Sequence, residues 1–248
     1  MKVASYSIIH YGKDYLDYAI QSIYDTVDSV FVFYTPHPSH GHKSNLPRLE
    51  SRKEILKSIS KQHFPKLIWI DCDQFWDEGP QRDFAVQTLI DKGADLITVL
   101  DYDEVWQDGQ LQKCLDYVWQ ENKAQKWLMN MLHFYRSFDE ACSDNMWPIR
   151  ILDTRHNEGT GYLSEFGKVL HFGYATTDDT IHYKWTLHGH LNEMRTNWQQ
   201  EKWLNYQKGI TKDVHPTCEN TWKPEPFNKF DLPDYMHLHP FFGRERIE

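Results

Sequence analysis

Two hydrophobic patterns alternate along the first 106 residues, and this alternation restricts the possible folds more than any other feature of the chain. Short apolar runs rich in β-branched side chains are typical of buried strands, whereas apolar residues three or four positions apart are typical of helices. The patterns predict strands at residues 3–10, 29–35, 66–75 and 96–100, and helices at residues 14–27, 51–62 and 79–93. Helices that connect successive strands imply a largely parallel sheet with right-handed crossovers, and therefore an α/β fold.

The second half of the chain has a different pattern. We expect a helix at 110–122, antiparallel neighbouring strands at 126–138 and 145–155, a mostly helical segment at 176–203, and an extended arm at 215–248. Turn-forming residues predict a loop at 36–47, and Ser51 with Glu54 three positions later predicts a capping box. The sequence contains no repeat or linker, so we expect a single domain over residues 1–248, with an α/β front half (1–106) and a mixed back half (107–248).

Composition excludes several classes of protein. A hydrophobic share of 40% and a charged share of 25% are those of a globular chain. The net charge of −9 argues against a protein that wraps nucleic acid, because binding to the phosphate backbone requires a basic face. The four cysteines form no CxxC pair, and no apolar run reaches the roughly 18 residues of a membrane span. We therefore expect reduced thiols and a soluble, cytoplasmic protein.

The run at 96–100 ends on three acids, Asp101, Asp103 and Glu104. Open α/β sheets bind ligands at the carboxyl ends of their strands. If the strand continued, alternation would place Asp101 and Asp103 on the same side, with Tyr102 pointing away. Adjacent carboxylates repel each other unless a cation lies between them, and a divalent metal prefers oxygen ligands. An isolated D-x-D also fits a solvated turn, so its position after the fourth strand is what favours a site.

Three segments resemble the glycosyltransferases of the GT-A fold, family 2 type, in a branch with bacterial and phage members. They read "VASYSIIHYGKDYLDYAIQSI", "QRDFAVQTLIDKGADLITVLDYDEVW" and "VLHFGYATTDDTIHYKWTLHGH". The resemblance implies a Rossmann-like half that binds a nucleotide-sugar and a mixed half that binds the acceptor, within one domain. It also implies that Asp101 and Asp103 hold Mn²⁺ or Mg²⁺ at the donor diphosphate, with His171 as the third ligand. Such a cation stabilises the charge that develops on the leaving diphosphate.

The resemblance implies further site residues. Lys184 would pair with the diphosphate and Asp101 would also contact the donor, although Lys184 fits a surface lysine and His171 a packing residue almost as well. The other implied donor contacts are Ser7, His10 and Tyr11 at the nucleoside, Tyr34 at the base, and Arg82 and Asp83 near the sugar. The donor would be a UDP-sugar in the first place, but "FYTPHP" lacks the acid that many members have there, which leaves other bases open.

The resemblance implies Glu165 in "YLSEFG" as the catalytic base, chosen from a set that also contains Asp153, Glu158, Asp178 and Asp179. The Glu-Asp pair usual in the family is absent, so inversion and retention of configuration both stay open. The acceptor hydroxyl could belong to a glycan, a small molecule, a protein or a hydroxylated DNA base. The lysine-rich stretch at 41–66 fits either a solvated helix or an acceptor-facing anionic site.

Two other functions remain open. A nucleotidyltransferase shares the α/β half and the metal-holding acids, but "IIHYGKDYL" lacks the Gly-rich, basic loop that usually follows its first strand, and no GxGxxG of a dehydrogenase is present there either. A non-catalytic sugar- or nucleotide-binding module would use the Trp-rich second half. A metal-free structural protein would leave Asp101 and Asp103 without a cation between them, which is costly.

Overall fold

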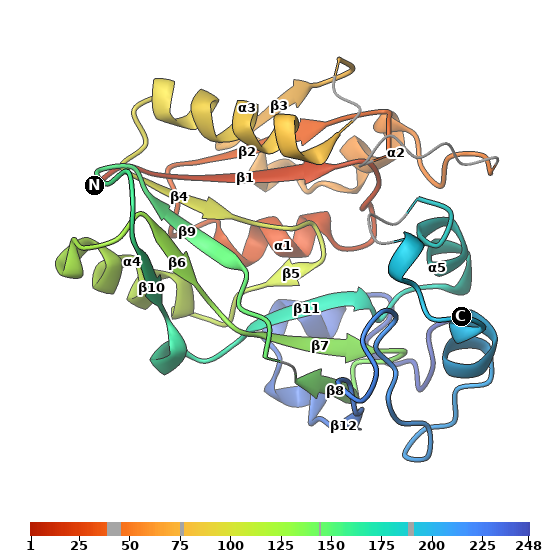
Figure 1. Ribbon diagram of the computed structural model, residues 1–248. Coiled ribbons are helices and arrows are strands. Elements are labelled where there is room, and N and C mark those ends of the chain that lie inside the picture. Colours follow the sequence, from red (N-terminus) through yellow and green to blue (C-terminus); the bar gives the residue numbers. More distant parts are fainter. Residues whose placement is uncertain (39–45, 75–76, 144, 188–190) are drawn as a thin grey trace.

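The computed structural model describes residues 1–38, 46–74, 77–143, 145–187 and 191–248, which form two neighbouring β-sheets with helices around them (Figure 1). The seven-stranded sheet has the order β10-β6-β9-β4-β1-β2-β3, and the five-stranded sheet has the order β12-β8-β7-β11-β5. The predicted loop at 36–47, the strand at 66–75 and the helical segment at 176–203 each include residues outside the described ranges.

The first sheet contains β1 (Val3–Ile9), β2 (Ser29–Tyr34), β3 (Leu67–Asp71), β4 (Leu96–Val99), β6 (Lys126–Leu128), β9 (Ile149–Asp153) and β10 (Thr160–Tyr162). The second contains β5 (Glu104–Val105), β7 (Met131–Tyr135), β8 (Glu140–Ser143), β11 (Val169–Tyr174) and β12 (Glu225–Pro226). The α-helices are α1 (Leu16–Ile23), α2 (Arg52–Ser58), α3 (Glu78–Asp91), α4 (Gln110–Glu121) and α5 (Asp178–Lys184).

The predicted parallel half is confirmed. β1 pairs in parallel with both β2 and β4, and β2 pairs in parallel with β3. Side chains alternate across β1, so that Val3 and Ile9 pack with α1, α2 and α4, while Ala4 and Tyr6 pack with α3 on the opposite face. Figure 1 shows α3 above this sheet and α1 below it. The protein thus has an α/β fold with helices on both faces of a mostly parallel sheet.

The predicted strand at 126–138 is wrong in one respect, because it forms two strands in different sheets. β6 joins the first sheet and pairs with β9 in the predicted antiparallel sense, whereas β7 joins the second sheet between β8 and β11. The chain changes sheets at Met129 and Asn130. Both residues are buried, so no exposed turn residue marks the end of β6 in the sequence. The back half therefore extends the front sheet as well as forming a second, mixed one.

The segment at 176–203 is less helical than expected. Its described residues form α5 and two short stretches, η4 (Leu191–Glu193) and the π-helix η5 (Gln199–Leu204). Three tryptophans of this segment pack against the second sheet instead of lining one face of a single long helix; they are Trp185, Trp198 and Trp203. No helix among the described residues has the length and apolar character needed to cross a bilayer.

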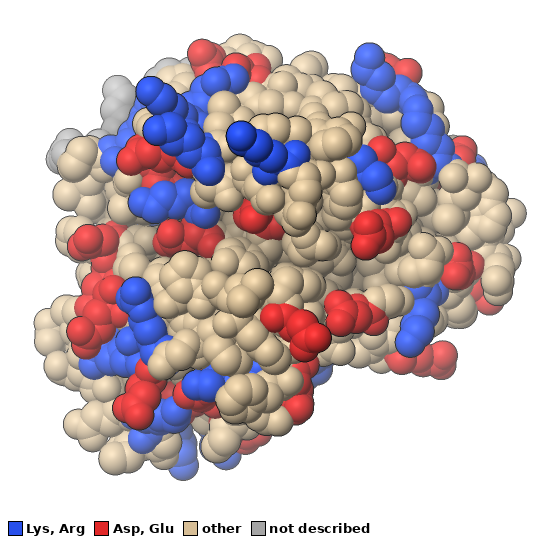
Figure 2. Space-filling view, turned by 180° about the vertical axis from the view of Figure 1, so that it is seen from behind, with Lys and Arg blue, Asp and Glu red and all other residues tan. Residues whose placement is uncertain are grey.

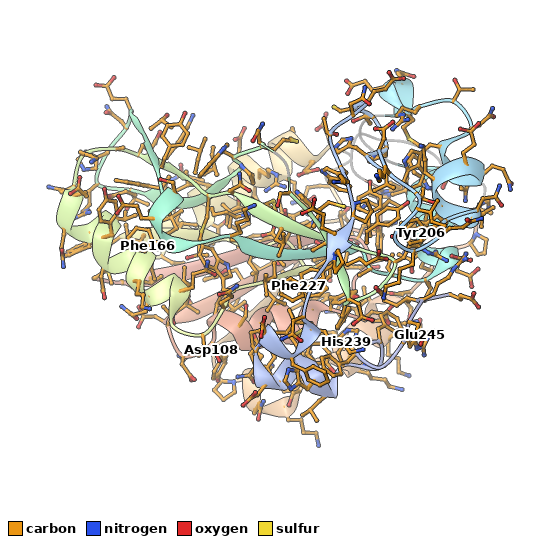
Figure 3. All side chains as sticks on the ribbon, turned by 90° about the horizontal axis from the view of Figure 1, so that it is seen from below. Asp108, Phe166, Tyr206, Phe227, His239 and Glu245 are labelled. Atoms are coloured by element: carbon orange, nitrogen blue, oxygen red, sulfur yellow. The ribbon has the colours of Figure 1, made fainter. Side chains whose placement is uncertain are left out.

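The C-terminal segment lies against α1 and the second sheet. It contains the short 3₁₀ turns η6 (Lys229–Asp231) and η7 (Asp234–Leu238), and it buries Met236, Phe241 and Ile247. The ring of His239, which is labelled in Figure 3, stacks on that of Tyr15 with centroids 4.5 Å apart. Its Nδ1 accepts the N–H of Phe241 at 3.1 Å, and its Nε2 lies 2.9 Å from the carbonyl of Asp14. These contacts fasten the end of the chain to the loop that follows β1.

Candidate functional site

Asp101 and Asp103 lie in the turn between β4 and β5, whereas Glu104 is the first residue of β5. β4 ends at Val99, and the N–H of Glu104, where β5 begins, donates to the carbonyl of Asp101 at 3.1 Å. The expectation that Asp101 and Asp103 share one side assumed a continued strand, and strand alternation does not apply here because the backbone turns after Val99. Asp101, Tyr102 and Asp103 each contact a different part of the molecule.

Tyr102 fixes the turn against the loop after β1. Its ring lies 5.3 Å from that of Tyr11, and a Cβ on Gly12 would come within 2.8 Å of it. Only glycine permits this close approach. The Glu50 carboxylate accepts the N–H groups of Gly12 and Lys13 at 2.8 and 2.9 Å, which holds the loop in place from the other side.

Asp101 is held by two arginines. Arg150 of β9 lies 3.1 Å from one of its oxygens, and Arg82 of α3 lies 3.6 Å from the other. Burial acts to raise the pKa of Asp101, but Arg150 and Arg82 outweigh it and lower the pKa below its usual range. Arg150 also donates to the fully buried carboxylate of Glu104. No role was predicted for Arg150, although a lone arginine in the apolar strand "IRILD" indicates a buried charge that requires a partner.

Asp103 has other neighbours than Asp101: it is only 4% exposed, and no guanidinium is paired to it among the described residues. Its carboxylate lies 3.7 Å from Nε2 of His171, and burial raises its pKa to about 6, although Lys184 acts to lower it. A Cβ on Gly173 would come within 2.8 Å of Asp103 and 2.6 Å of the His171 ring. The glycine thus leaves room for the carboxylate and imidazole to face each other.

Lys184 and His171 complete this side of the site. Burial lowers the pKa of Lys184, which the negative charge of Asp103 opposes, and its ammonium lies 4.6 Å from the centre of the Tyr174 ring. Burial also lowers the pKa of His171 well below its usual value, and the neighbouring His133 adds to that shift. The neutral imidazole is the form that ligates metals, because one of its ring nitrogens has a free lone pair.

These side chains fit the predicted metal in part. Among the described residues, no group of three or more His, Cys, Asp and Glu side chains is arranged to hold a metal ion. Asp103 and His171 supply an oxygen and a nitrogen that already converge, in a space that a Cβ on Gly173 would fill. Asp101 is engaged by the two arginines instead. Asp103 and His171 are therefore the two residues that would hold a cation here.

A cavity of about 510 Å³ opens beside the carboxyl ends of β2 and β3. Side chains of both charges line it: the positive ones are Arg48 and Arg52, and the negative ones are Glu50, Glu54, Asp71 and Asp73. Arg52 and Asp71 form a bidentate pair with distances of 2.6 and 3.0 Å. Glu50 also lines a cavity of about 10 Å³ that reaches Asp103 and Gly173, so the two spaces adjoin the same carboxylate. The larger cavity lies where open α/β sheets bind ligands.

Four predicted nucleoside contacts lie close to this edge but are largely covered. The Ser7 hydroxyl donates to the carbonyl of Leu100. His10 lies 3.1 Å from the Thr35 carbonyl and 2.8 Å from the Tyr183 hydroxyl. Tyr11 is buried against Tyr102.

Tyr34 lines the larger cavity, but it is 4% exposed and its ring packs on Trp69 at 5.6 Å. A base stacks on one open face of a ring, and the packed ring of Tyr34 has too little exposed surface for that, so an edge contact with its hydroxyl fits this position better than stacking.

Asp83 and Glu165 are not brought to the acids. In α3 the buried residues Gln81 and Ala85 face the sheet, so Asp83 is exposed to solvent. Glu165 is exposed in the 3₁₀ turn η3 (Ser164–Phe166), whose last carbonyl accepts from Gln110 of α4 at 2.8 Å. Figure 3 shows its neighbour Phe166 at the opposite end of the molecule from Tyr206. No hydrogen bond or ion pair of the described residues joins Glu165 to the acid turn.

The lysine-rich stretch contributes an exposed, mixed surface. Arg52, Lys53 and Lys57 of α2 are exposed. In Figure 2, which shows the molecule from behind, Lys and Arg side chains gather at the upper left with Asp and Glu side chains among them. This distribution fits the solvated helix better than a uniformly cationic site.

Comparison with known proteins gives limited information. No protein-family model matches the chain, and no curated protein matches it. A crystal structure of S. aureus TarS matches with a TM-score of 0.45 and 12% identity over 69% of this chain and 37% of that chain. A structure of S. aureus TarS 1–349 matches with a TM-score of 0.43 and 12% identity over 70% and 61%. The chain thus spans less than two thirds of either structure, and likenesses this weak carry no argument about function.

Proposed function

We propose that this protein is a metal-dependent glycosyltransferase that moves a hexosyl or pentosyl group from a nucleotide-sugar to a hydroxyl acceptor. The proposal rests mainly on one observation: Asp103, His171 and Lys184 converge at the carboxyl edge of the parallel sheet, and Glu50 links them to the large cavity. A nucleotide fits a cavity of about 510 Å³, because ligand sites of this kind span roughly 300–1,000 Å³.

Each residue has a defined task in this proposal. The carboxylate of Asp103 and the neutral imidazole of His171 bind Mn²⁺ or Mg²⁺, and the nitrogen ligand favours Mn²⁺. When bound, the cation supplies the positive charge that stabilises the leaving diphosphate. Lys184 adds a second positive charge, and because it is partly buried its effect is less screened by solvent than that of a surface lysine. Arg82 and Arg150 hold Asp101 ionised and keep the turn in one conformation.

The part of the large cavity beside β2 and β3 is where we place the nucleoside, but its lining does not indicate which base is bound. The sequence lacks an acid directly after β2, but β3 brings Asp71 and Asp73 into the same cavity. Asp71 is engaged by Arg52, whereas Asp73 is exposed in the lining. We therefore keep UDP-sugars as the first donors to test and include the other bases.

Thermal unfolding tests the donor site. The protein is melted with each nucleoside diphosphate, with Mn²⁺ or with chelator; a ligand at 100 times its Kd stabilises the folded state by about 2.7 kcal/mol. We expect one nucleotide to raise the Tm only with Mn²⁺, and Asp103→Ala to abolish the shift. Asp116→Ala, an exposed acid on α4 with no predicted role, is the matched control and should keep it. No metal-dependent shift with any nucleotide would contradict the proposal.

Release of sugar from the donor distinguishes the enzyme from the alternatives. A transferase releases some free sugar and nucleoside diphosphate when water replaces the acceptor, whereas a binding module releases none and a nucleotidyltransferase would release pyrophosphate from a nucleoside triphosphate. Glu165 remains the predicted base, and Glu165→Gln tests it: loss of transfer by about 10²–10⁴-fold with donor binding intact would support that role. Unchanged transfer would place the base elsewhere.

A further inference from the structure

His133 of β7, for which no role was predicted, lies beside His171 of β11. The two residues are register partners in parallel strands, so their side chains leave the sheet on the same face. Their Nδ1 atoms are 3.0 Å apart, which is a hydrogen-bonding distance. His171 thus has one ring nitrogen at His133 and the other, Nε2, at Asp103.

The ring of His133 is itself held in place. Trp222 stacks on it with centroids 4.4 Å apart and ring planes inclined by 30°. His133 is 7% exposed and Trp222 is 3% exposed, so neither ring can turn without opening the packed face of the second sheet. A hydrogen-bond acceptor fixed in this way also fixes the orientation of the group that donates to it.

An Nδ1–Nδ1 hydrogen bond has a strict proton count. Of the two facing nitrogens, one carries a proton and the other presents a lone pair. If His171 donates, its proton is on Nδ1 and its Nε2 presents a lone pair toward Asp103. If His133 donates, His171 carries its proton on Nε2, where it would block a cation. The direction of this one hydrogen bond therefore decides whether His171 can act as a ligand.

We propose that His133 is a positioning residue for the cation site: its Nδ1 accepts the Nδ1–H of His171 and so directs the His171 Nε2 lone pair toward Asp103. This inference rests on the proposed function for the identity of the cation site. Ligating histidines generally donate their second ring N–H to a fixed acceptor, and loss of that acceptor typically costs 10–100-fold in metal affinity. Gly173 leaves the space on the Asp103 side, and Trp222 closes the His133 side.

The first test measures binding of Mn²⁺ alone, from the decrease of the free Mn²⁺ signal in electron paramagnetic resonance. We expect His133→Leu to weaken binding by about 10–100-fold, because it removes the acceptor. His133→Asn should restore most of the affinity, since its side-chain oxygen can lie close to the position of Nδ1. His63→Leu is the matched control: His63 is 1% exposed and bonded to Asp17, and its loss should leave Mn²⁺ binding unchanged.

The second test uses the metal-free protein and distinguishes the inference from the proposed function. In ¹⁵N NMR of the imidazoles, wild type and His133→Asn should show His171 protonated at Nδ1, and His133→Leu should shift the proton toward Nε2. Wild type protonated at Nε2, or equal Mn²⁺ affinity in wild type and a folded His133→Leu, would overturn the role of His133. A wild type with the expected tautomer but no Mn²⁺ binding would instead overturn the metal dependence in the proposed function and, with it, the role of His133 at a cation site.

Discussion

The carboxylates of the segment at 101–104 lie in two different electrostatic environments. On one side, Asp101 and Glu104 share the buried Arg150, and Arg82 adds a second guanidinium. On the other side, Asp103 is buried beside a neutral imidazole, with Lys184 as a nearby charge. The first arrangement neutralises charge within the protein and stabilises the turn. The second leaves a carboxylate whose ionisation is opposed by burial, and a cation as we propose it would offset that cost.

Loss of Arg150 should have the largest effect on the paired side. Arg150→Met leaves Glu104, which has no exposed surface, without its guanidinium. Removing one partner of a buried ion pair costs about 3–5 kcal/mol, because an uncompensated charge stays buried. We expect this decrease in the free energy of unfolding in urea.

A double variant is the control for this prediction. Arg150→Met combined with Glu104→Gln removes both charges and should recover a large part of the loss, because replacing a whole buried pair is far less costly than breaking it. A loss below about 1 kcal/mol in the single variant would place Glu104 outside the ion pair and weaken the contrast between the two sides.

The burial of Asp103 without a paired guanidinium should be visible in the pH dependence of stability. Asp103 has a pKa of about 6 in the folded protein against an ordinary value of 3.8, so the native state binds this proton before the unfolded chain does. Its contribution to stability is fully present below about pH 4 and is lost as the pH rises through about 6. Two pKa units correspond to about 3 kcal/mol. The stability of wild type relative to Asp103→Asn, measured in chelator, should therefore fall by up to that amount between pH 4 and 7. A flat difference would mean that Asp103 is already paired.

Gly173 tests how closely Asp103 and His171 are fitted. In Gly173→Ala the new Cβ would meet both Asp103 and His171 at distances shorter than real Cβ contacts. Overpacking of this kind costs about 1–3 kcal/mol. We expect a lower Tm and weaker Mn²⁺ binding together. Gly243→Ala is the control, because nothing lies within 4 Å of the position of its Cβ, and it should leave Mn²⁺ binding unchanged. Normal Mn²⁺ binding by Gly173→Ala would show that Asp103 and His171 need not face each other.

The first strands and the capping box of the front half were predicted well from the sequence, because local patterns determine them. The runs at 3–10 and 29–35 and the capping box at Ser51 depend on neighbouring residues alone, and each was found as expected. Arg150 and His133 were missed because their partners are 46 and 38 residues away in the sequence. The acids were found, but the turn that carries Asp101 and Asp103 was not, since β4 ends at Val99 and Tyr102 packs against the distant Gly12. Contacts between distant segments, which no single-sequence pattern encodes, shape the site.

Asp101→Asn should have the smallest effect and the opposite pH dependence from Asp103→Asn. The Asp101 side chain is 33% exposed, so solvent screens its two ion pairs and their loss should cost only about 1 kcal/mol. Because Arg150 and Arg82 lower its pKa, this contribution is present above the ordinary value near 4 and is lost as the pH falls through the lower folded value. Relative to the Asn variants, wild type should lose the Asp101 contribution and gain the Asp103 contribution on acidification. Equal slopes in the two comparisons would show that one shared environment, and not two, surrounds the acids of this turn.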